Sequence, residues 1–204
     1  MTVLIRDPEF GNRIRSERQS MGLDRWDEVW EGVYVMAPLP NDEHQFLQSR
    51  LNTILDLVVG LNGLGEVRAG VNVSDRVVEW MQNYRCPDLA VFLKGTAAQN
   101  HSTFWVGGPD FAVEIVSPED SSRDKLSFYA SVGVRELLII DRAPWKLELY
   151  RLETGRLVLD GTSVAESPEL LHSQVVPLSY QLIPGGTRPS IVVTHNDGVR
   201  RWIL

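Results

Sequence analysis

The sequence predicts a mixed α/β fold, in which helices flank a mixed β-sheet. An apolar stripe at helical spacing runs through residues 42–58, and several short runs of β-branched and aromatic residues follow it. A second helix-like segment then separates the apolar runs "DFAVEIVS" and "ELLIID". Helices that alternate with strands in this order are typical of α/β proteins. The chain has 204 residues, so we expect a single domain over residues 1–204.

The first predicted elements are an arm, a strand and a helix. Residues 1–25 carry five arginines and four acids with little periodicity, which indicates an arm or a short helix before the core. The stretch "WEGVYVMAP" at residues 30–38 predicts a strand that enters a proline-marked loop. A helix should follow, because Asp42 and Gln45 stand at capping-box spacing. Its apolar stripe consists of Leu47, Leu51, Ile54, Leu55 and Val58.

The middle of the chain predicts strands around a second helix. Residues 63–95 read as short strands broken by Gly, Asn and Asp, which favours an antiparallel ladder with "PDLAVF" as its most buried member. "DFAVEIVS" is the next strand, and the helix after it should begin near Ser121 or Ser122 and end at Gly133. "ELLIID" is almost entirely apolar, as expected for a strand covered on both faces.

The remaining segments predict further strands. "RAPW" should turn the chain, and we expect Asp141 before it to organise that turn. In "KLELYRL" the alternation of Leu147 and Leu149 with Lys146 and Glu148 predicts a strand with one solvated face. Residues 153–204 form a C-terminal extension with a final apolar strand, "SIVVTH".

Composition and charge exclude several classes of protein. With 43% hydrophobic and 23% charged residues the chain is an ordinary globular protein. It shows no signal-peptide pattern and no apolar stretch of membrane-spanning length, so we expect a cytoplasmic protein without membrane contact. A net charge of −7 argues against strong non-specific attraction to nucleic acid, although a bound cation can reverse the potential in one cleft. Cys86 is the single cysteine, and we interpret it as a packed thiol.

Two carboxylates stand in apolar surroundings. In an extended strand Glu114 shares its face with Ala112 and Val116, while its neighbours on the other face are also apolar. Burial of a carboxylate there is costly unless a cation or hydrogen-bond donors compensate it. Asp88 presents the same problem in "RCPDLAVF".

These acids and a nearby lysine are the ingredients of a magnesium site that hydrolyses phosphodiesters. Hard oxygen ligands hold the cation, and an ammonium can orient the water or offset charge on phosphorus. Lys125 lies in the second turn of the predicted helix, with Tyr129 on the same helix face. The alternative interpretation is a salt bridge between Glu114 and Lys125, with Asp88 capping a turn.

The same residues resemble a known family. The stretches "GVYVMAPLPNDEHQ", "RCPDLAVF" and "FAVEIVSPEDSSRDKLSFYASVGVRELLIIDRAPWKLELYRL" look like the Uma-two type of putative restriction endonucleases, a branch of the PD-(D/E)XK nuclease superfamily. The resemblance covers about residues 30–152 and implies a restriction-endonuclease-like core. The superfamily pattern matches Asp88 and Glu114, but Val116 occupies its lysine position. In this family the lysine has moved to the following helix, which makes it Lys125.

The resemblance also implies a cofactor, further site residues and a substrate. Mg²⁺, or alternatively Mn²⁺, would be held by Asp88, Glu114 and the carbonyl of Ile115. An acid on the first superfamily helix sometimes completes the metal shell, and Glu43 and His44 are the local candidates. His44 could instead cap the helix or fill a polar pocket. The implied reaction is hydrolysis of DNA by water attack, which leaves a 5′-phosphate.

Two other functions stay open from the sequence. One is a catalytically inactive nuclease fold that binds nucleic acid or protein, which the acidic charge and Val116 favour. The other is a metal-dependent hydrolase of a small phosphoester. A homodimer would suit cleavage of both DNA strands, because a symmetric dimer brings two active sites.

Overall fold

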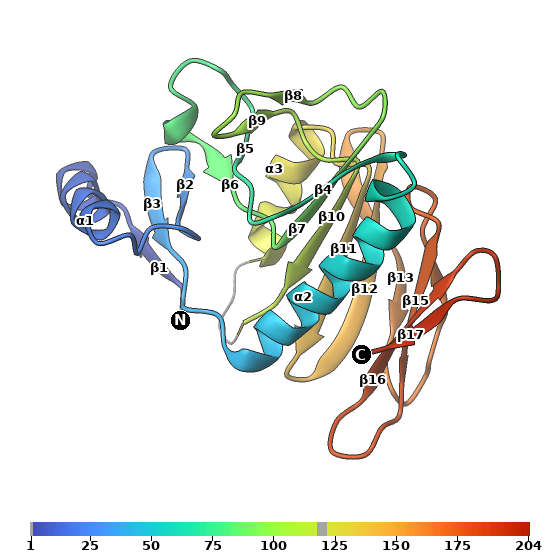
Figure 1. Cartoon of the computed structure of the whole chain (residues 1–204). Helices are drawn as coiled ribbons and strands as arrows, with labels where there is room; N and C mark the ends of the chain where they lie inside the picture. The colour runs from blue at the N-terminus through green and yellow to red at the C-terminus, as the bar shows by residue number, and fades with distance from the viewer. Residues whose placement is uncertain (1, 118–121) are drawn as a thin grey trace.

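The computed structural model describes residues 2–117 and 122–204, and it confirms the mixed α/β fold (Figure 1). Within these residues the strands form three sheets. The central sheet lies between an N-terminal sheet on one side and a C-terminal sheet on the other, and the helix α2 crosses in front of it.

The central sheet contains the two predicted apolar strands. Its strands, in spatial order, are β13 (Arg156–Ser163), β12 (Trp145–Glu153), β11 (Glu136–Arg142), β10 (Phe111–Ile115), β7 (Leu89–Leu93) and β4 (Gly65–Ala69). β10 and β11 are parallel, as a crossover through a helix requires, and the other neighbours are antiparallel. The predicted alternation along β10 is confirmed, because Phe111 and Val113 belong to one apolar cluster and Ala112 to the cluster on the opposite face.

Helix α2 (Asp42–Leu55) covers one face of this sheet and continues into a π-helical turn (Asp56–Gly60). The predicted apolar stripe is confirmed, since all five of its side chains are buried in the cluster that contains Phe111 and Val113. The predicted cap was one residue late. The side chain of Asn41 caps the helix, because its Oδ1 accepts the His44 amide at 3.0 Å.

The second helical segment packs on the opposite face. A 3₁₀ turn (Ser122–Lys125) leads into α3 (Leu126–Ser131), and Gly133 follows with a φ of +86°. The predicted stop is therefore confirmed, because glycine readily adopts this left-handed conformation. Of the two predicted starts, Ser122 begins the 3₁₀ turn, while Ser121 lies outside the described residues.

The N-terminal region holds more regular structure than an arm. β1 (Val3–Ile5) precedes α1 (Pro8–Ser20), whose first turn is capped by the Asp7 carboxylate accepting the Phe10 amide at 2.8 Å. The strand predicted over residues 30–38 is present as a shorter strand before the proline-marked loop, but the turn at its start was not predicted. The chain forms a hairpin of β2 (Glu28–Trp30) and β3 (Val33–Met36), because Glu31 and Gly32 both have positive φ and make a two-residue turn.

The antiparallel ladder predicted over residues 63–95 was only partly correct. β4 and β7 pair in the central sheet, whereas β5 and β6 join the N-terminal hairpin in another sheet. Within that sheet β5 and β9 are parallel. The spatial order is β1, β3, β2, β6, β5, β9 and β8, and the remaining strands are β5 (Val73–Ser74), β6 (Tyr84–Arg85), β8 (Gln99–Asn100) and β9 (Trp105–Val106). A 3₁₀ turn, Trp80–Gln82, precedes β6.

The C-terminal extension adds β13 to the central sheet, and its remaining strands form an antiparallel sheet over the core. The strands of that second sheet are β14 (Leu171–His172), β15 (Leu178–Ile183), β16 (Ser190–His195) and β17 (Arg201–Ile203). Leu178, Leu182 and Ile191 are fully buried in the same cluster as the stripe of α2. The tail and the central sheet therefore share one apolar core.

The solvated face predicted for residues 146–148 was wrong. Glu148 is buried, and the Arg123 guanidinium donates to its Oε2 at 2.7 Å from Nη2 and 3.1 Å from Nε. Asp141 also faces Arg123 and Lys146, so it belongs to this ionic cluster and not only to the turn after β11. The predicted alternation of apolar and polar side chains along β12 is correct, but Arg123, from the turn before α3, covers Glu148 on the polar face.

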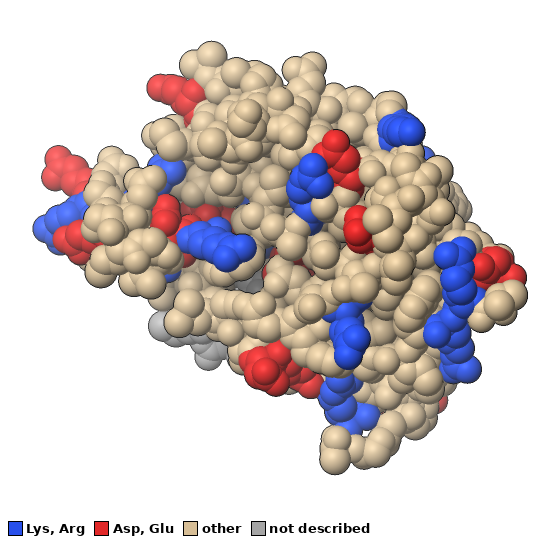
Figure 2. Space-filling model, viewed as in Figure 1, with Lys and Arg blue, Asp and Glu red and all other residues tan. Residues whose placement is uncertain are grey.

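Charges are interspersed over the surface. On the face drawn in Figure 2, basic and acidic side chains of the described residues lie side by side and do not separate into two large regions. No described helix is long and apolar enough to cross a membrane.

Candidate active site

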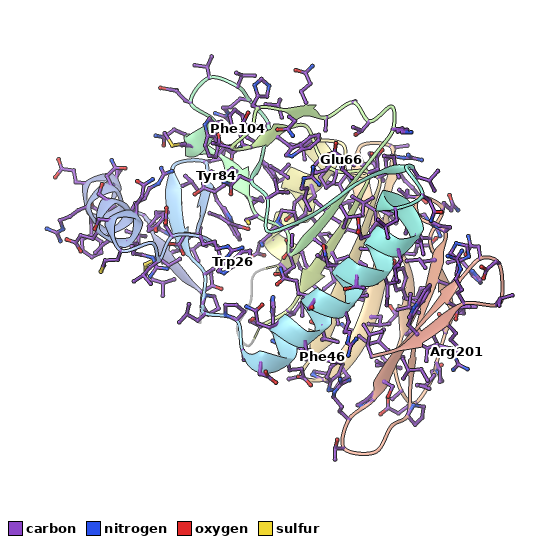
Figure 3. All side chains as sticks on the ribbon, viewed as in Figure 1. Trp26, Phe46, Glu66, Tyr84, Phe104 and Arg201 are labelled. Atoms are coloured by element: carbon purple, nitrogen blue, oxygen red, sulfur yellow. The ribbon has the colours of Figure 1, made fainter. Side chains whose placement is uncertain are left out.

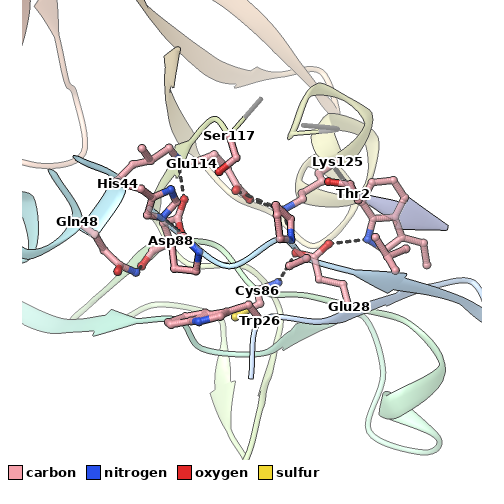
Figure 4. A pocket seen from close by; sticks show the side chains of 16 residues that line it. Thr2, Trp26, Glu28, His44, Gln48, Cys86, Asp88, Glu114, Ser117 and Lys125 are labelled. Carbon is pink, nitrogen blue, oxygen red and sulfur yellow. Dashed lines mark hydrogen bonds and ion pairs between the residues drawn. The ribbon is translucent and has the colours of Figure 1, made fainter. Parts of the chain in front are cut away.

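A pocket opens where the N-terminal strands meet the ends of β7 and β10 (Figure 4). The space between its walls, counted out to the open mouth and the solvent there, is about 660 Å³. Its lining is partly apolar and aromatic and partly polar. The apolar residues include Trp26, Trp30, Val35, Pro38 and Pro40, and the polar residues include Glu28, His44, Gln48, Asp88, Glu114 and Lys125. Figure 3 shows Trp26 between the N-terminal strands and the central sheet.

Asp88 stands where the pairing of β7 with β10 ends. The last paired residues are Leu89 and Val113, and the Asp88 side chain replaces the next backbone contact. Its Oδ2 accepts the Ile115 amide at 2.7 Å, and its Oδ1 lies 2.9 Å from His44 Nε2. The two strands therefore diverge at this point, and the carboxylate stays at the pocket wall with 15% of its side-chain surface exposed.

Glu114 is buried at the floor of the pocket, with 3% of its surface exposed. Tyr129 donates its hydroxyl to Oε1, and Lys125 Nζ lies 3.1 Å and 3.2 Å from the two carboxylate oxygens. Burial, together with the charge of Glu114, holds the pKa of the Tyr129 phenol well above its usual range. Tyr129 is therefore a hydrogen-bond donor at neutral pH. The salt bridge considered from the sequence exists, and it lies inside the pocket.

Lys125 also contacts an acid that the sequence did not single out. Its Nζ lies 2.8 Å from Glu28 Oε1, on β2. The Cys86 amide donates to the same oxygen at 2.9 Å, and the Trp30 indole donates to Oε2 at 2.6 Å. Glu28 is 4% exposed, so a second buried carboxylate faces the ammonium from another sheet.

The accessory residues divide between the pocket and the surface outside it. His44 and Gln48 follow each other by one turn on α2, and Gln48 donates to the Asp88 carbonyl at 2.9 Å. The sequence analysis did not single out Gln48. Its signal was that Gln48 and His44, one helical turn apart, are polar residues on the buried face of α2. Glu43 does not line the pocket. It pairs with Arg188 at 3.2 Å and Arg142 at 3.6 Å, because its helix position points away from the apolar face.

Ile115 and Cys86 also line the pocket. Ile115 donates its amide to Asp88, and its carbonyl remains a proposed ligand. Cys86 is buried, and desolvation raises the pKa of its thiol well above the usual value. The interpretation of Cys86 as a packed thiol agrees with this environment.

The donor chemistry of the pocket suits a hard divalent cation. Among residues 2–117 and 122–204, no three His, Cys, Asp or Glu side chains gather closely enough to share a metal. Mg²⁺ needs fewer protein ligands, since one or two carboxylates, waters and substrate phosphates usually bind it. The charged side chains of the lining are three carboxylates and one ammonium, a formal charge of −2 with His44 neutral. Asp88 and Glu114 therefore fit such an ion in both oxygen type and charge.

The comparisons with known proteins point to nucleases. The model of the Uma2 family, described as "Putative restriction endonuclease", matches residues 22–183. That range is wider than the resemblance noted in the sequence and includes Glu28. Among solved structures, the chain is similar to a putative nuclease belonging to DUF820 from Anabaena variabilis ATCC 29413, with 19% identity and a TM-score of 0.58. The alignment covers 72% of this chain and 80% of that chain, and the likeness shows the fold. A search of curated proteins found no match.

Proposed function

Because the chain belongs to the Uma2 family of putative restriction endonucleases, we propose that it is a metal-dependent endonuclease that hydrolyses phosphodiester bonds of DNA. The observation that carries this proposal is the convergence of Asp88, Glu114 and Lys125 on one pocket. These residues come from the ends of two strands and from a helical turn. A structural ion pair alone would not require the open pocket beside it.

The proposed cofactor is Mg²⁺, with Mn²⁺ as the alternative. Asp88, Glu114 and the Ile115 carbonyl would hold it. When bound, such an ion neutralises phosphate charge and lowers the pKa of a coordinated water.

The side chains of the pocket have distinct proposed roles. The Lys125 ammonium would orient the attacking water and offset negative charge that develops on the phosphorus oxygens. Tyr129 fixes the rotation of the Glu114 carboxylate through its hydrogen bond. His44 does the same for Asp88 from the first turns of α2. The product of this attack would carry a 5′-phosphate.

DNA is the proposed partner. Cleavage of both strands would be served by a homodimer, which supplies two sites related by symmetry. We further propose a cytoplasmic location.

Calorimetry of Mg²⁺ and Mn²⁺ binding, with plasmid nicking followed on the same samples, tests the function. The parent protein should bind metal and nick DNA. Glu114→Ala should lose both activities, and Lys125→Met should lose only nicking. Glu66→Ala is the matched control, because Glu66 is an exposed acid outside the pocket, paired with Arg68.

Each contrary result has a defined meaning. Retained metal affinity in a folded Glu114→Ala protein would sink the assignment of the metal site. A parent protein that binds DNA but neither binds metal nor cuts would favour the inactive binding module. Hydrolysis of nucleotides without cleavage of polynucleotides would favour the small-phosphoester hydrolase.

A further inference from the structure

The Lys125 ammonium lies between two buried carboxylates that belong to different sheets. Glu114 is on β10 of the central sheet, and Glu28 is on β2 of the N-terminal sheet. Glu28 is the nearer of the two, at 2.8 Å against 3.1 Å. Figure 4 shows the ammonium between these two side chains.

We propose that Glu28 is a positioning residue, which keeps the Lys125 ammonium in the pocket when Glu114 acts as a cation ligand. This inference rests on the proposed function and adds a residue to it. Glu28 itself is not assigned to the cation.

The first argument is the rigidity of Glu28. The Trp30 indole and the Cys86 amide donate to its two different oxygens, at 2.6 Å and 2.9 Å, so the carboxylate cannot rotate freely. Its backbone is fixed as well, because β2 pairs with β3 and with β6. A carboxylate held in this way is a fixed counter-charge.

The second argument is the mobility of Lys125. A lysine side chain is a flexible four-carbon stem that carries a compact charge. Lys125 is the last residue of the 3₁₀ turn before α3, and Glu114 is on β10. The lysine side chain therefore spans the distance from this turn to the floor of the pocket. The position of its nitrogen therefore depends on its partners more than on its backbone.

The third argument is electrostatic competition. When Glu114 shares its charge with a divalent cation, its attraction for the ammonium weakens and the cation repels the same ammonium. A buried ammonium without a counter-charge is strongly destabilised. Glu28 supplies that counter-charge independently of Glu114, and so prevents Lys125 from leaving the pocket.

The test uses the full-length Glu28→Gln protein, which keeps the size of the side chain but removes its charge and one of its two acceptor oxygens. The turnover number for plasmid nicking should fall about 10- to 100-fold, the usual effect of losing a group that orients a catalytic one. The KM for DNA and the calorimetric Mg²⁺ affinity should change less than about threefold. On whatever residual nicking rate the Lys125→Met protein keeps, Glu28→Gln should have no further effect.

A second readout does not depend on activity. The chain has three lysines, so acylation of Lys125 can be followed by mass spectrometry with the exposed Lys94 as an internal reference. With saturating Mg²⁺, Lys125 should be protected in the parent and should react about tenfold faster in Glu28→Gln. Circular dichroism and thermal melting verify that each variant is folded.

Glu136→Gln is the matched control. Glu136 is also a buried, ion-paired acid, but it lies at the opposite end of the central sheet, where Arg151 Nε binds it at 3.0 Å. This variant should lose stability without changing either readout. If Glu28→Gln folds poorly, Trp30→Phe removes one donor to Glu28 and should give a smaller effect in the same direction.

The outcomes separate this proposal from the function on which it rests. Suppose that the parent protein nicks DNA, and that Glu28→Gln has the same nicking rate and the same protection of Lys125. That result would overturn the positioning role but not the proposed function. Loss of Mg²⁺ binding in Glu28→Gln would make Glu28 a ligand and would also overturn it. An additive effect in the Lys125→Met background would do the same. Parent protein that neither binds metal nor nicks overturns the proposed function, and the positioning role with it.

Discussion

Gly70 is the residue that lets Trp26 form a wall of the pocket. Its φ is +60°, and a Cβ at this position would lie 1.9 Å from a ring atom of Trp26. Its amide donates to the Asp88 carbonyl at 3.2 Å, so the same backbone segment contacts a proposed metal ligand. Both the conformation and the absence of a side chain are required there.

We therefore expect Gly70→Ala to destabilise the protein and to move Trp26. Gly22→Ala is the matched control, because Gly22 also has a positive φ, of +67°, but its Cβ would meet no atom within 4 Å. The control should lose about 1–2 kcal/mol of unfolding free energy from backbone conformation alone. Gly70→Ala should lose a further 1–3 kcal/mol or so from the steric clash. Denaturant unfolding measures both values, and equal losses would show that Trp26 moves aside without cost.

Several of the residues that meet at the pocket could be picked out from the sequence, but Glu28 could not. Alternation along β10 and the helical period after it bring Lys125 and Tyr129 to Glu114, because both patterns are local. Glu28 lies 97 positions from Lys125 in the sequence and is one of 27 acids. Only the contact between two sheets distinguishes it, and no local pattern encodes that contact.

An ionic cluster fixes the 3₁₀ turn that carries Lys125. Arg123, two residues earlier, binds Asp141 on β11 and Glu148 on β12. Tyr150 donates its hydroxyl to Glu148 at 2.8 Å, and Lys146 Nζ lies 2.7 Å from it. The turn is therefore attached to the central sheet through charge.

This cluster predicts a loss of stability in acid. Burial alone would raise the pKa of Glu148, but hydrogen bonds from Lys146, Tyr150 and Arg123 outweigh it and hold the pKa below the ordinary value of 4.5. A carboxylate whose pKa is lower in the folded state stabilises the fold above that ordinary value. The contribution is lost as the pH falls through the folded-state pKa.

Melting temperatures from about pH 7 to pH 3 test this dependence. Glu148→Gln should be less stable than the parent at neutral pH, and the difference should shrink as the parent carboxylate becomes protonated. Glu66→Gln removes an exposed, paired carboxylate and should leave the fall of the melting temperature at low pH almost unchanged. A constant difference between Glu148→Gln and the parent at every pH would contradict the expected linkage.

Element types were more predictable than element partners. The buried stripe of α2 and the apolar β10 and β11 follow from periodicity. The hairpin of β2 and β3 was misread, because Glu31 and Gly32 interrupt an otherwise continuous aromatic and β-branched run. The sheet to which β5 and β6 belong depends on contacts with the N-terminal strands, which no local pattern reveals.

At the scale of the whole molecule, we expect residues 1–204 to unfold as one unit. Leu182 on β15 is fully buried in the core shared with α2 and the central sheet. Arg201, labelled in Figure 3, begins β17, which is an edge strand of the C-terminal sheet. A C-terminal sheet joined in this way cannot separate without exposing the core.

Leu182→Ala should lower the unfolding free energy by about 2–5 kcal/mol, because it leaves a cavity in the shared core. Ile203→Ala is the control, since Ile203 is 64% exposed and should change stability by less than about 0.5 kcal/mol. Calorimetry should show a single transition that moves as a whole to lower temperature. Two transitions, with only one shifted by Leu182→Ala, would divide the chain into separate domains.

The gathering of Asp88, Glu114 and Glu28 in the lining of one pocket also has a consequence for the history of the family. Three carboxylates in one pocket repel one another, so under the proposed function the arrangement reduces stability and is kept by selection for activity. A gene copy released from that selection would gain stability by replacing these carboxylates and Lys125 together with neutral residues, because a buried ammonium left without its counter-charges is destabilising. We expect descendants that have lost the activity to be recognisable by neutral side chains at these positions, together with a higher melting temperature.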